Sequence, residues 1–159
     1  RMFAEERKSG TEQLLLTSPR SIISIVMGKF LAAVTIVLIT LIISIMYFVI
    51  VSFFGNANLV TVLVTMLGFL LLAMAAISFG MFASSITENQ IIAGVITIAG
   101  LLVIWFMPSF YSSLSNFSLI NVFSNTFPQG IMTWPALTLF ISFSIIFTIY
   151  EILFKTSFK

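Results

Sequence analysis

The 159-residue sequence contains no cysteine and no histidine, and only 8% of its residues are charged. Without cysteine the chain has no disulfide, thiolate metal site or thiol nucleophile, and without histidine it lacks the commonest metal ligand and general base. We therefore expect no metal site and no catalytic residue. A soluble domain carries roughly 25% charged residues, because its surface must be hydrated. With 60% apolar residues and a mean hydropathy of +1.20, this chain is predicted to be an integral membrane protein.

The few charges fall into three clusters. The first lies within residues 1–29, the second is Glu88 alone, and the third lies within residues 151–159. Between them, residues 30–87 and 89–150 carry no charge. An apolar stretch of about 20 residues crosses a bilayer as a helix, so each uncharged region has room for two spans and a turn. We therefore predict an all-α integral membrane protein with four transmembrane helices.

The turns and prolines place the four spans within these regions. Gly55–Asn58 is a small polar turn, Pro108 is expected to stop the third span, and Pro135 suits the first turn of the fourth. The chain then divides into a cytoplasmic segment (1–29) and a transmembrane bundle (30–159). The predicted spans are about 30–54, 59–83, 90–107 and 136–154, with an outer loop at 108–135.

The charge distribution also predicts the orientation in the membrane. With four spans, all three charged clusters lie on one side, and the loops 55–58 and 108–135 on the other side are uncharged. Lys and Arg concentrate on the cytoplasmic side, so both ends of the chain are predicted to be cytoplasmic. Because the chain begins with Arg1 rather than Met, we expect it to be a piece of a longer protein.

The outer loop contains a weak helical signal. Phe117, Ile120, Phe123 and Phe127 recur at near-helical spacing. Such spacing predicts a short helix in the outer membrane interface, with its apolar side toward lipid.

The segment before the first span predicts a short cytoplasmic helix. Ser9 and Glu12 have the spacing of a capping box, and three leucines (residues 14–16) follow. Ser18 is expected to cap the next helix, with Pro19 as its first residue. Two interpretations of the leucines remain open: they lie in the lipid interface or on neighbouring spans, or they fill a groove on a soluble partner, with residues 5–8 as the polar rim.

Small residues at helical spacing indicate close helix packing. Lipid offers little hydrophobic drive, so small side chains let helix backbones approach. We favour packing within the chain over a chain–chain interface. The predicted packing residues are Ala76, Gly80 and Ser84 on the second span and Ala93, Thr97 and Gly100 on the third. Glu151 and Lys155, four residues apart, are expected to pair across one helical turn at the interface.

Three motifs, in order, resemble a known family. Residues 3–19 resemble the cytoplasmic signature of type-2 ABC transporter permeases, notably the branch that includes gliding-motility and nitrous-oxide-reductase-associated permeases. Gly28–Ala33 and Gly80–Ile91 match the start of one span and a later turn. The resemblance extends to about Trp105. It departs at Glu12-Gln13, where relatives often have an apolar residue followed by Glu.

The resemblance implies a fold and partners that the residues alone do not. The full protein would have six spans, and the helix around Thr11–Thr17 would be the coupling helix that docks on a separate ATP-binding subunit. Two permease chains, identical or different, and two ATPase subunits would form the transporter in the lipid bilayer. The implied docking residues are Glu5, Glu6, Arg7, Lys8, Ser9, Gly10, Thr11, Glu12, Leu14, Leu15, Leu16, Thr17, Ser18 and Pro19.

The chain itself lacks a phosphate-binding loop. Gly28-Lys29 is followed by Phe30 instead of Ser or Thr, and Ile23 replaces the first glycine of the motif. We therefore expect no cofactor and no enzymatic activity in this chain, because ATP and Mg²⁺ would be bound by the partner subunit. The expected function is that of an ABC exporter permease in a bacterial cytoplasmic membrane, with no nucleic-acid partner.

Two other functional classes remain open. A membrane scaffold would recruit a cytoplasmic partner without ATP-driven transport. An ion-coupled carrier would need an ionisable residue in spans outside this sequence, because the four predicted spans contain no charged residue apart from Glu151 near the cytoplasmic end of the last. The transported substrate is not indicated by any residue pattern: lipid-like molecules, peptides, drugs, ions and polysaccharides all remain candidates.

Overall fold

The computed structural model describes residues 9–10, 21–55, 58–110 and 118–157. The coupling helix predicted around residues 11–17, and every docking residue other than Ser9 and Gly10, lie outside the described residues. The described part of the chain contains helices and no strand. Its elements are α3 (Ile22–Phe54), α4 (Leu59–Ile86), α5 (Gln90–Phe110), α6 (Leu119–Thr126), the short 3-10 helix η2 (Phe127–Gln129) and α7 (Trp134–Ser157).

Four of these helices, α3, α4, α5 and α7, are long and apolar enough to cross a membrane. The all-α fold with four spans is therefore confirmed. α3 begins at Ile22, where the Ser21 hydroxyl caps the helix by accepting a hydrogen bond from the Ser24 amide at 3.3 Å. The predicted cap Ser18 and the predicted first helical residue Pro19 lie outside the described residues. The 33 residues of α3 measure about 50 Å, which exceeds the thickness of the hydrocarbon core.

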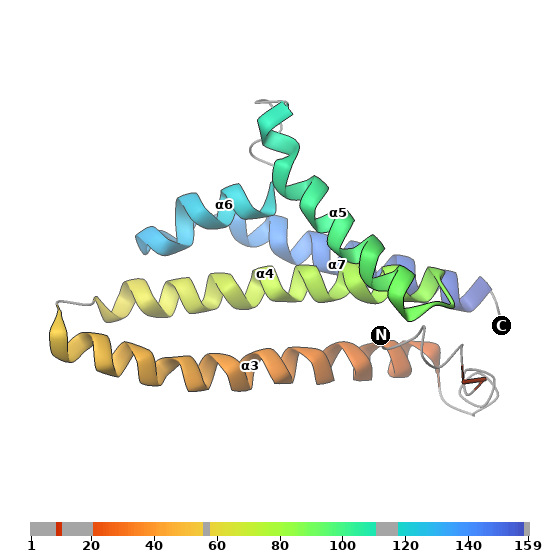
Figure 1. Ribbon diagram of the computed structural model, residues 1–159, viewed down its shortest axis with the longest axis horizontal. Coiled ribbons are helices and arrows are strands. Elements are labelled where there is room, and N and C mark those ends of the chain that lie inside the picture. The colour runs from red at the N-terminus through yellow and green to blue at the C-terminus, as the bar shows by residue number, and fades with distance from the viewer. Residues whose placement is uncertain (1–8, 11–20, 56–57, 111–117, 158–159) are drawn as a thin grey trace.

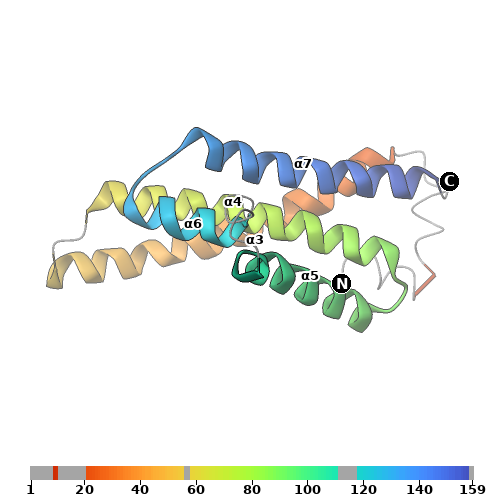
Figure 2. The same cartoon turned by 90° about the horizontal axis from the view of Figure 1, so that it is seen from above.

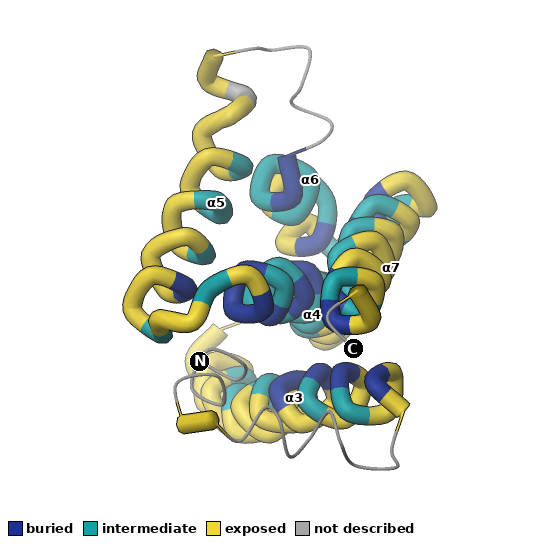
Figure 3. The backbone as a smooth tube through the Cα atoms, turned by 90° about the vertical axis from the view of Figure 1, so that its right-hand side faces the viewer, coloured by how far each residue is buried: buried dark blue, intermediate teal, exposed yellow. Residues whose placement is uncertain are grey.

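α4 lies at the centre of the molecule. It contacts α3, α5, α6, η2 and α7, and the end-on view shows it surrounded by the other helices (Figure 3). α3 and α4 run side by side in opposite directions, and α5 diverges from them toward its C-terminal end (Figure 1). α4 is apolar on all sides, as is typical of a helix that spans a membrane.

The charged residues gather at one end of the bundle. The start of α3, the turn between α4 and α5, and the end of α7 lie together, and the turn between α3 and α4 lies at the opposite end (Figures 1 and 2). We call the first the charged end, because it holds all four charged residues in the described part of the chain. They are Lys29, Glu88, Glu151 and Lys155. We call the opposite end, with the 55–58 turn, α6 and η2, the uncharged end.

Pro108 does not stop α5, contrary to the prediction. The helix continues to Phe110. Proline lacks the N–H that would bond the carbonyl of Ile104 four residues earlier. The Ser118 hydroxyl donates to that carbonyl instead, at 3.3 Å. The helix keeps its last turn because a side chain from the following segment replaces the missing donor.

The short helix of the outer loop is present as α6, but its apolar side faces the protein. Leu119 and Phe127 are buried and form one cluster with Ala75, Ala136 and Phe140 from α4 and α7. The predicted orientation toward lipid is therefore wrong for Phe127, and for Phe123, which packs against the same cluster. The sequence did not reveal this because the packing partners on α4 and α7 are distant along the chain. Phe117 lies outside the described residues.

α7 begins at Trp134 and ends at Ser157. Pro135 is therefore in its first turn, as predicted, where the missing N–H costs nothing. α4 ends at Ile86 and α5 begins at Gln90, so Glu88 lies between these two helices.

Candidate functional site

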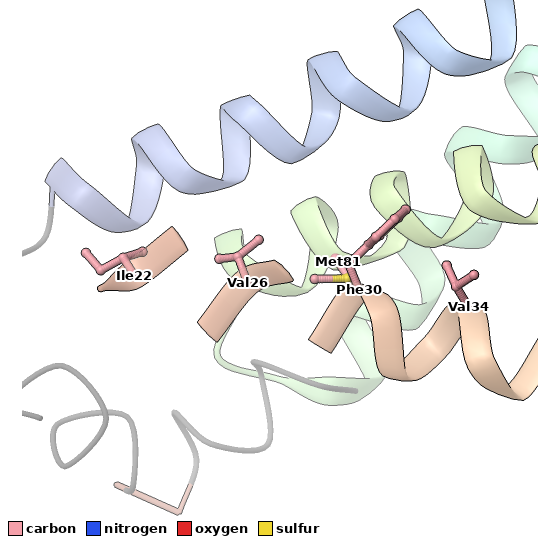
Figure 4. Packing of buried hydrophobic residues seen from close by; sticks show 5 residues of the cluster. All are labelled: Ile22, Val26, Phe30, Val34 and Met81. Atoms are coloured by element: carbon pink, nitrogen blue, oxygen red, sulfur yellow. The ribbon is translucent and has the colours of Figure 1, made fainter. Parts of the chain in front are cut away.

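An apolar stripe fixes the start of α3 at the charged end. Ile22, Val26, Phe30 and Val34 recur every four residues, so they share one face of the helix. They are buried against Met81 of α4, as Figure 4 shows, and Ile152 of α7 packs against the same cluster. Three helices therefore meet at the end of the bundle where the chain enters α3.

A buried carboxylate lies beside this stripe. Glu151 of α7 is fully buried, and neither of its carboxylate oxygens has a hydrogen-bond partner within the described structure. Lys155, one turn further along α7, is 5% exposed. The positive charges of Lys155 and of Lys29, which belongs to α3, both act on the Glu151 carboxylate. We refer to Lys29, Glu151 and Lys155 as the charge cluster.

The charge cluster contains the pair of Glu151 and Lys155 expected from the sequence and a third residue, Lys29, that was not expected. The i, i+4 spacing identified Glu151 and Lys155, and their attraction is present. Both side chains are buried within the protein. The contribution of Lys29 was missed, because a residue 122 positions away on another helix leaves no local pattern. The sequence contained one indication of this contact: Lys29 and Glu151 each lie at the charged boundary of an apolar span.

An apolar groove begins next to the charge cluster. It lies between α3, α4 and α7 and has a volume of about 280 Å³. Its lining includes Phe30, Met74, Ile141, Thr148 and Ile152. Phe30 and Ile152 are the direct sequence neighbours of Lys29 and Glu151, so the groove and the charge cluster share the same helix turns.

The predicted small residues lie between α4 and α5. A Cβ added at Gly80 would lie 3.3 Å from the Thr97 methyl group, so the two helices approach closely there. Ser84 and Ala93 are both buried beside this contact and line one groove with it. Ala76 lines a second groove between α4, α5 and α6, and a Cβ at Gly100 would collide with the Phe79 ring. The close approach of α4 and α5 is therefore at Gly80 and Thr97.

The uncharged end contains a docking contact that sequence reasoning missed. Gly68 of α4 lies directly under Phe127, and a Cβ at Gly68 would lie 2.7 Å from the Phe127 Cβ. The Thr65 hydroxyl lies 3.0 Å from the Phe127 carbonyl oxygen and 2.7 Å from that of Thr61. Gly130, at φ 73°, turns the chain beside Thr61. A lone glycine in an apolar span gives no sign of which ring it accommodates.

The chemistry available to the described residues is limited. They contain no group of three or more Asp, Glu, Cys or His that would hold a metal ion. Of the predicted docking residues, Ser9 and Gly10 are described, and they form an exposed turn. The features with functional potential are therefore the charge cluster, the adjoining apolar groove and the segment that leads into α3.

Comparison with known proteins identifies a family. The sequence model described as "ABC-2 family transporter protein" matches residues 1–159, which is the whole chain. A search of curated proteins and a search of solved structures each returned no match.

Proposed function

Because the chain belongs to the ABC-2 transporter family and forms part of a membrane-spanning ABC permease, we propose that it couples ATP hydrolysis by a separate subunit to substrate export. The observation that carries the proposal is the family match over the whole chain. It is supported by four long apolar helices whose described charged residues gather at one end. We place the protein in a bacterial cytoplasmic membrane, in the branch that resembles gliding-motility and nitrous-oxide-reductase-associated permeases.

The charged end is proposed to face the cytoplasm. Residues 1–29 carry five of the seven basic residues, and Lys and Arg concentrate on that side of membranes. Because the chain has no cysteine, the orientation is testable with single cysteines and a membrane-impermeant maleimide applied to intact cells. Ala57→Cys should react from outside, whereas Glu88→Cys should react only after the cells are opened. The reverse labelling pattern would contradict the orientation.

The ATP-binding subunit is proposed to dock on residues 3–19 through the helix around Thr11–Thr17. This segment ends two residues before Ser21, which caps α3. A force applied to the docking helix would therefore reach the start of α3 directly. In this assembly the partner binds ATP and Mg²⁺, and this chain needs no cofactor of its own. A second permease chain, identical or related, would complete the membrane part.

The test is a pull-down of the full-length permease from detergent, comparing wild type with Leu15→Asp. We expect an ATP-binding subunit to co-purify with the wild type and to be lost from the variant, because a carboxylate would be buried in an apolar docking groove. Glu88→Gln is the matched control, since it changes a charged residue at the same end of the bundle outside the docking segment. It should retain the subunit.

Each result has a defined meaning. Retention by wild type and Glu88→Gln, with loss from Leu15→Asp, supports docking through residues 3–19. Retention by all three places the docking site elsewhere. If no ATP-binding subunit is captured even by the wild type, the proposal of an ATP-driven permease fails, and the leucines are better explained by contact with the lipid interface.

A further inference from the structure

The charge cluster joins two helices that are far apart in sequence. Glu151 and Lys155 belong to the last turns of α7, whereas Lys29 belongs to α3, which follows the proposed docking segment. α3 and α7 are in direct contact, and Ile152 packs against the apolar stripe of α3. A relative movement of these helices at the charged end would change the distance between Lys29 and Glu151.

The burial of the Glu151 carboxylate makes the contact between α3 and α7 unusual. Both carboxylate oxygens are buried and have no hydrogen-bond partner in the described part of the chain. A buried charge is costly unless it is paired and hydrogen-bonded. The attraction of Lys155 and Lys29 offsets part of that cost. The described arrangement therefore leaves Glu151 able to gain a hydrogen bond from a Lys ammonium that moves toward it.

We propose that Glu151 is a positioning residue of the transport cycle, which forms an ion pair with Lys29 and thereby couples movement of α3 to α7. This inference rests on the proposed function, in which force enters through the segment before α3. Lys155 attracts the Glu151 carboxylate, but it belongs to the same helix, so its distance from Glu151 does not depend on how α3 and α7 are placed. The distance between Lys29 and Glu151 does depend on that placement, because Lys29 belongs to α3. The apolar groove beside the cluster changes shape when the two helices move, since both helices line it.

The first test is a double-mutant cycle on the thermal unfolding of the full-length permease. Lys29→Gln should lower the midpoint, because it removes one of the two charges that compensate Glu151. The reduction should be smaller when Glu151→Gln is also present. Lys29→Gln combined with Glu88→Gln is the matched control and should be additive, because Glu88 is exposed. Additive effects of Lys29→Gln and Glu151→Gln would overturn the proposal.

The second test measures movement, which a purely structural pair would not affect. Spin labels at Ile23→Cys and Leu153→Cys occupy exposed positions on α3 and α7 near the charge cluster, and labels at Phe53→Cys and Trp134→Cys mark the same helices at the uncharged end. In the complex with its ATP-binding subunit, ATP should change the first distance more than the second. Glu151→Gln should abolish most of that change.

Charge exchange provides the rescue. Lys29→Glu alone places two carboxylates together and should suppress the ATP-dependent distance change, whereas Lys29→Glu with Glu151→Lys should restore it. If Glu151→Gln leaves the distance change intact in complexes that retain the ATP-binding subunit, Glu151 has no positioning role. Failure of the proposed function would be visible earlier and separately, as absence of that subunit from the wild-type complex.

Discussion

At the uncharged end, η2 rests against α4 with the Phe127 ring over Gly68 and the Phe127 carbonyl near the Thr65 hydroxyl. At the charged end, α3, α4 and α7 also meet in an apolar cluster, but beside it lies a buried carboxylate without a hydrogen bond. The Phe127 carbonyl at the uncharged end has a hydrogen-bond donor, whereas the Glu151 carboxylate at the charged end has none among the described residues. Under the coupling proposed above, helix movement is expected at the charged end, and the docking of η2 on α4 is expected to stay fixed.

The tight packing at the uncharged end is tested most strongly by removing the Phe127 ring. Phe127 is fully buried, and it lies 5.9 Å from both Phe123 and Phe140, measured between ring centroids. Phe127→Ala should lower the free energy of unfolding in detergent by about 3 kcal/mol, because it leaves a large cavity. Phe53→Ala, at an 81% exposed position, should change it by no more than about 0.5 kcal/mol. Equal effects would contradict tight docking at the uncharged end.

The second test fills the space that Gly68 leaves. Gly68→Ala should destabilise the protein by about 1–3 kcal/mol, because the added methyl group collides with Phe127. Gly94→Ala is the matched control on α5, where no atom lies within 4 Å of the added Cβ. It should be neutral or slightly stabilising, since alanine favours a helix over glycine.

Combining Gly68→Ala with Phe127→Ala tests whether the glycine and the ring contact each other. Removal of the ring creates room for the methyl group, so Gly68→Ala should cost much less in that background. Unfolding titrations of the four proteins would measure this coupling. Additive free energies would mean that the glycine and the ring do not meet.

The third test concerns Ser118, whose side chain contacts the backbone of both α5 and α6. Its hydroxyl donates to the Ile104 carbonyl of α5, and its oxygen lies 3.5 Å from the Asn121 amide at the start of α6. Ser118→Ala should cost about 1 kcal/mol, as for loss of an N-cap, and should speed amide hydrogen exchange at Ser109 and Phe110. Ser124→Ala, an exposed serine of α6, should alter neither. Unchanged exchange at the end of α5 would show that Pro108 is tolerated for another reason.

Sequence patterns were sufficient to predict the number and approximate position of the spans. An apolar run of this length forms few stable structures other than a membrane-spanning helix. Sequence patterns failed where the outcome depends on a distant partner. Pro108 ends no helix because Ser118 supplies a donor from the next segment. The periodicity of residues 120–127 identified an apolar side of this segment, but not that Gly68 and Phe140 would cover Phe127. Glu151 was matched with Lys155 by spacing, whereas Lys29 became visible only once α3 lay beside α7.

The smallest expected effect comes from the Thr65 hydroxyl. Thr65→Val keeps the side-chain shape but removes the donor to the Phe127 carbonyl, and interhelical hydrogen bonds in membrane proteins contribute about 0.6 kcal/mol on average. Thr35→Val is the control, because the exposed Thr35 hydroxyl bonds only the Leu31 carbonyl of its own helix within the described structure. If Thr65→Val costs more than Thr35→Val in matched unfolding titrations, the hydroxyl adds to the docking of η2. Equal costs would assign that docking to Phe127 and Gly68, because the remaining contact at this end is then apolar packing.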